Sequence, residues 1–148
     1  MEIQQDFKEL LRLFQENHVD FLIVGGYALA FHGAPRFTGD IDVYVKPDED
    51  NAIKILKALD EFGFGGLGIS VEDLSVEEKV LQLGVPPVRV DIITSLSGIT
   101  WEEAYKNREK GFFADLEVFF IGKSDFIKNK RATSRKRDLS DIEELGEI

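Results

Sequence analysis

The sequence contains no cysteine and only two histidines, His18 and His32, among its 148 residues. Disulfides, thiolate zinc sites and cysteine nucleophiles are therefore excluded, and a metal site rich in imidazole is not expected. A metal ion would have to be held by carboxylates, which favours Mg²⁺ or Mn²⁺. No apolar run approaches the roughly 20 residues of a membrane span. Residues 1–6 do not resemble a signal peptide, so we expect a cytoplasmic protein without a membrane partner.

The composition is that of an ordinary globular protein, with 43% hydrophobic and 31% charged residues. The length fits a single domain over residues 1–148. The formal net charge of −10 argues against a protein that coats nucleic acid. One segment, residues 123–137, is basic nonetheless, with seven lysines and arginines and a single acid. It suits one bound polyanion, such as a triphosphate or an RNA end, or it forms a solvated helix face.

The periodicity of the apolar residues predicts a domain of the α/β (α+β) class. A period of two predicts four strands: Phe21–Val24, Asp40–Val45, Val88–Ile93 and Glu117–Ile121. A helical period predicts six helices: Glu2–Asn17, Tyr27–Phe31, residues 47–62, Thr100–Arg108, Ser124–Ala132 and Ser134–Leu145. Residues 76–83 fit the end of a helix as well as a strand. We expect a small mixed sheet with helices packed chiefly on one side.

Two acidic residues, Asp40 and Asp42, share one face of the otherwise apolar second strand. Carboxylates placed in this way repel each other unless a cation lies between them, and a divalent metal ion is the usual cation. The first strand ends at Gly25 and Gly26, and glycines let backbone N–H groups approach a phosphate at the start of a helix. Together, the glycine turn and the acidic pair predict a site for a metal-bound nucleotide.

A third carboxylate, Asp91, lies in the middle of the β-branched strand Val88–Ile93, with Arg89 on the same face. Burial of an unpaired charge at this position would be costly. Two interpretations are open at this point. Asp91 forms an ion pair with Arg89, or it joins Asp40 and Asp42 as a third metal ligand.

These residues resemble a known family. The motif Val24-Gly25-Gly26, followed after thirteen residues by Asp40-Ile41-Asp42-Val43, is similar to the signature of DNA polymerase β-like nucleotidyltransferases. Asp91 stands where that superfamily has its third carboxylate. The longer segment Gly25–Asp42 and the tail Asp125–Asp141 resemble the minimal nucleotidyltransferases of the abortive-infection (AbiEii-like) toxin–antitoxin type. The resemblance covers residues 21–145.

The resemblance implies transfer of a nucleoside monophosphate from an NTP to an acceptor hydroxyl of an RNA 3′ end, a protein or a small molecule. It implies that Asp40, Asp42 and Asp91 hold Mg²⁺ or Mn²⁺ and carry the catalysis, with Asp91 the candidate to receive the acceptor's proton. The nucleotide-binding residues that it implies are Gly25, Gly26, Arg36, Thr38 and Lys130. The acidic residues are expected to open onto a cleft between the sheet and the basic C-terminal helices. A cognate antitoxin and a second copy of the chain are the partners it suggests.

Two alternatives to an enzyme are left open by the residues. A protein of the same fold without catalytic activity could bind a nucleotide or a partner protein, since one fold hosts many functions. The three carboxylates could also form a surface cluster that binds nothing. This last alternative requires Asp91 to lie buried or paired with Arg89, away from Asp40.

Overall fold

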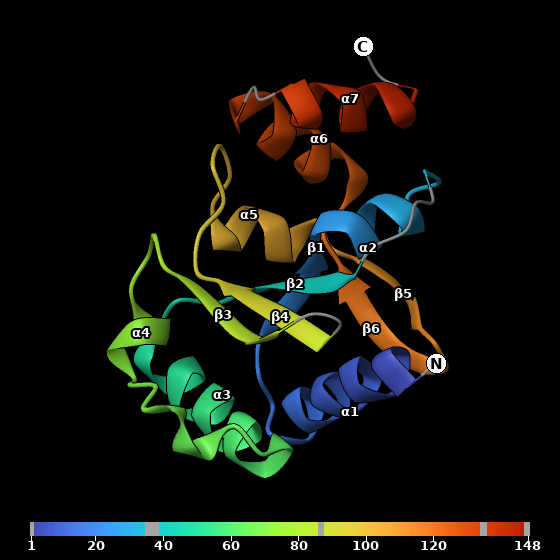
Figure 1. The fold of residues 1–148 in the computed structure, drawn as a ribbon. Helices are drawn as coiled ribbons and strands as arrows, with labels where there is room; N and C mark the ends of the chain where they lie inside the picture. The colour runs from blue at the N-terminus through green and yellow to red at the C-terminus, as the bar shows by residue number, and fades with distance from the viewer. Residues whose placement is uncertain (1, 35–38, 86–87, 134–135, 147–148) are drawn as a thin grey trace.

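A mixed β-sheet forms the centre of the computed structural model, which describes residues 2–34, 39–85, 88–133 and 136–146 (Figure 1). Within these residues, six strands are hydrogen-bonded in the order β3-β4-β2-β1-β6-β5. Their bounds are β1 Phe21–Val24, β2 Asp40–Val45, β3 Val80–Val85, β4 Val88–Ile93, β5 Glu109–Phe113 and β6 Leu116–Phe120. Strand β2 pairs antiparallel with β1 and parallel with β4, so that its side chains align with those of both neighbours.

The helices are distributed along the whole described chain. Their bounds are α1 Glu2–Glu16, α2 Gly25–Phe31, α3 Glu49–Phe62, the 3₁₀ helix η1 Gly65–Leu67, α4 Glu72–Ser75, α5 Trp101–Lys106, α6 Lys123–Thr133 and α7 Lys136–Glu144. The two longest helices, α1 and α3, lie side by side along one face of the sheet, whereas α6 and α7 lie beyond its other side (Figure 1). No helix in the described ranges is long and apolar enough to cross a membrane.

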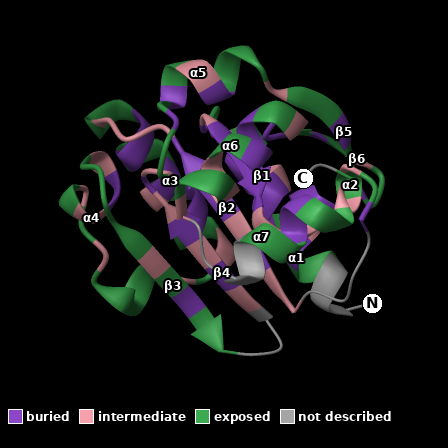
Figure 2. Ribbon diagram, turned by 90° about the horizontal axis from the view of Figure 1, so that it is seen from above, coloured by how far each residue is buried: buried purple, intermediate pink, exposed green. Residues whose placement is uncertain are grey.

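The core follows from the alternation of side chains along the central strands. Ile41 and Val43 of β2 are fully buried on the face covered by α1, whose Phe14 packs edge-on against Phe21 of β1 with ring centroids 5.4 Å apart. On the opposite face, Tyr44 of β2 packs against Trp101 of α5 at 5.1 Å. Buried residues gather on the central strands, while the edge strand β3 is largely exposed (Figure 2). The core therefore covers one whole face of β2, and on the other face it covers the end of the strand that follows Asp42.

The α/β class and the mixed sheet are confirmed, and each of the four predicted strands is present within one residue of its expected bounds. Two further strands, β3 and β5, were not predicted as such. The ambiguous residues 76–83 divide into the segment after α4 and the first part of β3. Strand β5 has the sequence Glu-Lys-Gly-Phe-Phe, which lacks an apolar alternation. Both are edge strands, where one partner and partial exposure weaken the hydrophobic pattern.

Asn51 connects the start of α3 to the two central strands. Its side chain is buried, with Oδ1 accepting the backbone N–H of Asp20 at 2.8 Å. Its Nδ2 donates to the carbonyls of Asp20 and Lys46, each at 3.0 Å. Asp48 caps the same helix by accepting the backbone N–H of Asn51. One amide thereby joins the segments that lead into β1 and out of β2.

We predict that Asn51→Ala lowers the free energy of unfolding by about 2–4 kcal/mol, because three partly buried hydrogen bonds to the backbone of Asp20 and Lys46 are lost. Urea denaturation measures the change, with Lys57→Ala on the exposed face of α3 as the control. A loss below about 0.5 kcal/mol, the usual effect of a surface substitution, would show that this amide does not hold the helix to the sheet.

Candidate active site

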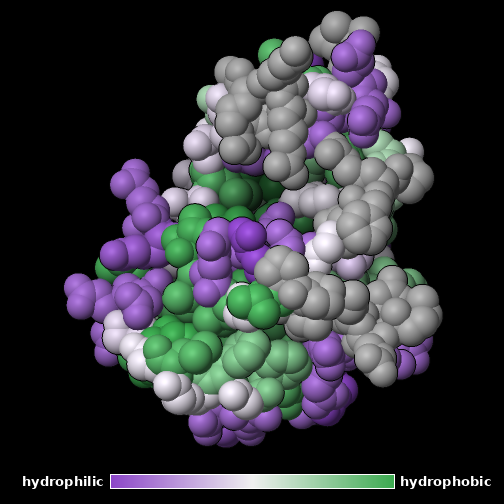
Figure 3. All heavy atoms as spheres, viewed as in Figure 1, coloured by the Kyte–Doolittle hydropathy of each residue, from purple (hydrophilic) through white to green (hydrophobic). Residues whose placement is uncertain are grey.

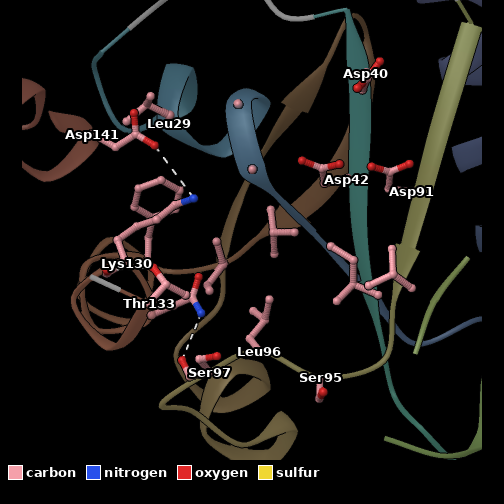
Figure 4. Close-up of a pocket in the computed structure, with 18 of the residues that line it drawn as sticks. Leu29, Asp40, Asp42, Asp91, Ser95, Leu96, Ser97, Lys130, Thr133 and Asp141 are labelled. Atoms are coloured by element: carbon pink, nitrogen blue, oxygen red, sulfur yellow. Dashed lines mark hydrogen bonds and ion pairs between the residues drawn. The ribbon is translucent and has the colours of Figure 1, made fainter. Parts of the chain in front are cut away.

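The parallel pairing of β2 with β4 brings the three predicted carboxylates together. In this register Asp42 is paired with Asp91, and Asp40 is paired with Arg89. Paired residues on neighbouring strands point to the same face, so all four side chains share one side of the sheet. Figure 4 shows Asp42 and Asp91 side by side, with Asp40 further along β2. The structure therefore brings Asp91 to the acidic pair, from a strand about fifty residues later in the chain.

The carboxylates open onto a cleft of about 940 Å³. Its floor is the acidic face of the sheet, and its walls are the segment Ser95–Ser97 and helix α6, with Asp141 of α7. Figure 3 shows the molecule hollowed between the C-terminal helices and the sheet. The side-chain amide of Asn129 on α6 donates to the carbonyl of Ser97 at 2.9 Å, which ties the two walls together. The expected cleft between the acidic face of the sheet and the C-terminal helices is present.

The proximity of the carboxylates changes the protonation of Asp42. Burial, followed by repulsion from Asp91 and then from Asp40, raises the pKa of the Asp42 carboxyl from 3.8 to about 6. The positive charge of Lys130 acts in the opposite direction, and a hydrogen bond with Asp91 raises the pKa further. Asp42 and Asp91 are thus adjacent carboxylates, and ionisation of Asp42 is costly without an added cation.

Arg89 supplies one cation at this pair. Its Nε and Nη2 atoms donate to the two carboxylate oxygens of Asp91, each at 3.1 Å, and Nε lies 3.8 Å from Oδ2 of Asp40. The hydrogen bond to Asp91 is the main reason that the pKa of the guanidinium is raised. The predicted ion pair between Arg89 and Asp91 therefore exists. It does not draw Asp91 away from the acidic pair, because Asp91 lies directly beside Asp42.

Gly25 gives Asp42 the space it occupies. The residue has φ +67°, a backbone conformation that residues other than glycine rarely adopt. A Cβ at this position would overlap Oδ2 of Asp42 and lie 2.9 Å from its Cγ. Gly25 and Gly26 both line the cleft at the start of α2. Gly25 of the glycine turn therefore lies directly against Asp42 of the acidic pair.

Lys130 faces these residues from α6 on the opposite wall. Its Nζ atom lies 3.8 Å from Oδ2 of Asp141 and 5.3 Å from the ring of Phe126 (Figure 4). Two other predicted nucleotide-binding residues, Arg36 and Thr38, lie outside the described residues. Asp141 was not singled out from the sequence, because it stands among several acids of the C-terminal tail. Its burial on α7 is a property of the folded structure, which the sequence did not signal.

The donor set suits a divalent ion held by oxygen, since carboxylates are the ligands that Mg²⁺ and Mn²⁺ prefer. The space that Gly25 leaves for the Asp42 carboxylate supports this fit. In the described part of the chain, however, no group of three or more acidic or histidine side chains is already arranged as a metal site. Asp40, Asp42 and Asp91 could bind an ion only with some change of their side-chain positions. The largest obstacle is Arg89, which holds both oxygens of Asp91.

Comparison with other proteins gives the fold and a family. Residues 1–146 match the family described as "Nucleotidyltransferase of unknown function (DUF6036)". A Thermotoga maritima protein described as a nucleotidyltransferase has a TM-score of 0.63 at 13% identity, over 98% of this chain and 91% of that chain. The lincosamide antibiotic adenylyltransferase LnuA, solved with bound lincomycin, has a TM-score of 0.58 at 14% identity, over 96% and 95%. No curated protein sequence matches this chain significantly.

We predict that Asp42→Asn stabilises the metal-free protein at pH 8 by about 1–3 kcal/mol, because each unit of raised pKa costs about 1.4 kcal/mol when the group is ionised. The folded pKa of about 6 exceeds 3.8, so the native state binds the proton first as the pH falls. The destabilisation of the folded protein by ionised Asp42 is therefore complete above pH 6 and disappears towards pH 4. Urea denaturation in EDTA at several pH values measures it. Asp6→Asn, on the exposed surface of α1, should show no such dependence, and an Asp42→Asn effect constant with pH would contradict the assignment.

Gly25→Ala is expected to lower the free energy of unfolding by about 2 kcal/mol or more, from left-handed backbone strain and displacement of the Asp42 side chain. Gly66→Ala is the control, since a Cβ at Gly66 meets no atom within 4 Å. Thermal and urea unfolding of the two variants provide the comparison. Equal stability of both would mean that the approach of Asp42 to Gly25 does not constrain the fold.

Proposed function

The chain belongs to the DUF6036 family of nucleotidyltransferases, and from this premise we propose that it moves a nucleoside monophosphate from an NTP to an acceptor hydroxyl in a metal-dependent reaction. The observation that carries the proposal is the placement of Asp40, Asp42 and Asp91 on one face of adjacent strands. They open onto a cleft of about 940 Å³, at the upper end of the range that holds small ligands. An NTP therefore has room beside the carboxylates.

The residues around the carboxylates are assigned to the triphosphate. Gly25 and Gly26 line the cleft without side chains, so that phosphate oxygens can approach the backbone N–H groups there. Lys130 contributes positive charge from the facing wall, and its charge lowers the pKa of the Asp42 carboxyl. Arg36 and Thr38 are assigned to the same role from the sequence. Together, these groups would orient the α-phosphate towards the acidic face.

Asp40, Asp42 and Asp91 are the residues assigned to hold Mg²⁺ or Mn²⁺. The bound ion would supply charge to offset the triphosphate and would lower the pKa of the attacking hydroxyl. We assign acceptance of the hydroxyl proton to the adjacent carboxylates of Asp42 and Asp91. Arg89 donates to both oxygens of Asp91 and so orients this carboxylate beside Asp42.

A second candidate function is nucleotide binding without transfer. The observation in its favour is that Arg89 occupies both oxygens of Asp91, the third carboxylate of the set. The AbiEii-like toxin–antitoxin type, with a cognate antitoxin or a second copy of the chain as partner, also stays a prediction. The acceptor is proposed only as a hydroxyl group, on RNA, on a protein or on a small molecule.

We predict that the protein transfers label from an α-³²P NTP to an acceptor in the presence of Mg²⁺ or Mn²⁺. Asp42→Asn should reduce the rate by roughly 1,000-fold or more, because a carboxylate placed at the reacting phosphate is lost. Asp6→Asn should retain the full rate. Each NTP is incubated with total RNA, total protein and a small-molecule extract, and the labelled fraction identifies the acceptor class.

Two results would contradict the proposal. Transfer by Asp42→Asn at the unaltered rate would remove the catalytic assignment. Saturable binding of the NTP without transfer to any of the three acceptor fractions would favour the binding module. EDTA should abolish transfer by the unaltered protein, and continued transfer in its presence would exclude a metal-dependent reaction.

A further inference from the structure

Arg89 lies where a cation of the site would be expected. It precedes Asp91 by two residues on β4 and is paired with Asp40 on β2, so that it stands on the acidic face between two of the three carboxylates. Its guanidinium donates to both oxygens of Asp91 at 3.1 Å, and its Nε is 3.8 Å from Asp40. The side chain of Asp91 is 13% exposed, and that of Arg89 is 31% exposed. The contact therefore belongs to the floor of the cleft and not to the outer surface.

This arrangement is difficult for a metal ion to displace. A planar guanidinium that donates two parallel hydrogen bonds to one carboxylate makes one of the stronger ion pairs in proteins. Arginine does not lose its proton at any ordinary pH, so its charge cannot be removed to make room. The strand register fixes the Cα positions of Arg89, Asp91 and Asp40 relative to one another. A metal ion that used Asp91 would have to compete with a partner that is attached two residues away.

Enzymes with two metal ions hold them roughly 3.5–4 Å apart between shared carboxylates. The nitrogen atoms of Arg89 occupy the corresponding space beside Asp91 and Asp40. Asp42 lies on the other side of Asp91, next to Gly25 and facing Lys130 across the cleft (Figure 4). The acidic face thus has a corner filled by a guanidinium and a corner that opens onto the cleft.

We propose that Arg89 is a resident cation that takes the place of one divalent metal ion, so that the site binds a single Mg²⁺ or Mn²⁺ through Asp42 and Asp40. Asp91, which the proposed function counts as a third ligand, stays bound to Arg89 in this refinement. This inference rests on the proposed function, which places a metal ion at these carboxylates. Arg89 is a positioning residue in this arrangement, since it holds Asp91 against Asp42. The observation that no described group of three acidic side chains is preformed as a metal site agrees with it.

The experiment counts bound Mn²⁺ by electron paramagnetic resonance, in which free hexaaquo Mn²⁺ gives the signal and bound Mn²⁺ does not. The metal alone is titrated into the unaltered protein and into Arg89→Met, which keeps an unbranched side chain but removes the charge and the hydrogen-bond donors of the guanidinium. We expect Arg89→Met to bind one more Mn²⁺ per chain than the unaltered protein. The second Mn²⁺ should bind to Arg89→Met roughly tenfold more tightly than a second Mn²⁺ binds to the unaltered protein. Arg89→Lys keeps a cation and should bind as many ions as the unaltered protein.

Arg12 provides a matched control, because it is also paired with two carboxylates, Glu9 and Glu16, but lies on α1 away from the cleft. Arg12→Met should leave Mn²⁺ binding unchanged. If Arg89→Met does not fold by circular dichroism, Arg89→Gln replaces it, since glutamine retains hydrogen-bond donors without charge.

Equal numbers of Mn²⁺ in Arg89→Met and the unaltered protein would overturn the inference, as would an additional ion in Arg89→Lys. The result is separable from the proposed function. An additional ion in Arg89→Met, in a protein that transfers no nucleotide, would keep the role of Arg89 and refute the transferase. Nucleotide transfer by the unaltered protein, together with equal Mn²⁺ binding by it and by Arg89→Met, would support the transferase and refute the role of Arg89.

Discussion

The site depends on repulsion between carboxylates that the sheet does not allow to separate. The hydrogen bonds between β2 and β4 set Asp42 beside Asp91, and the backbone of neither residue can move away without breaking that register. The energetic cost is visible in the raised pKa of Asp42, and Arg89 and Lys130 offset only part of it. An arrangement selected for stability alone would place an apolar residue at one of these positions. The retained cost agrees with the cation binding proposed for these residues.

The rest of the fold serves to keep this acidic face accessible on one side. Helices α1 and α3 fill the opposite face with apolar side chains, so the sheet is held rigid from behind. On the open side, α6 and α7 stand across a cleft and bring positive charge at Lys130. The turn at Gly25 allows the chain to pass directly over Asp42. The cleft is thus formed by segments far apart in the sequence: the turn at Gly25, strands β2 and β4, and the C-terminal helices.

The sequence predicted the central strands β1, β2 and β4 well, because each carries a short apolar run whose side chains lie in the core. It did not predict β3 and β5, whose edge positions weaken that signal. Asp40, Asp42 and Gly25 were recognised from local motifs. That Asp91 lies beside Asp42 could be only a hypothesis, since register is a property of the folded sheet. Asp141 gave no signal, because the helix packing that turns it inward is decided by tertiary contacts.

The central claim is that the three carboxylates form the place where a metal-bound nucleotide sits. Paramagnetic broadening of backbone amide signals in ¹⁵N NMR spectra, with Mn²⁺ and a non-hydrolysable NTP, tests it most directly. The account predicts that the amide signals of Gly25, Asp42 and Asp91, which line the cleft, broaden before those of residues outside it. Broadening confined to the acidic residues 143–147 of the tail, with the signals of those three residues unaffected, would contradict it.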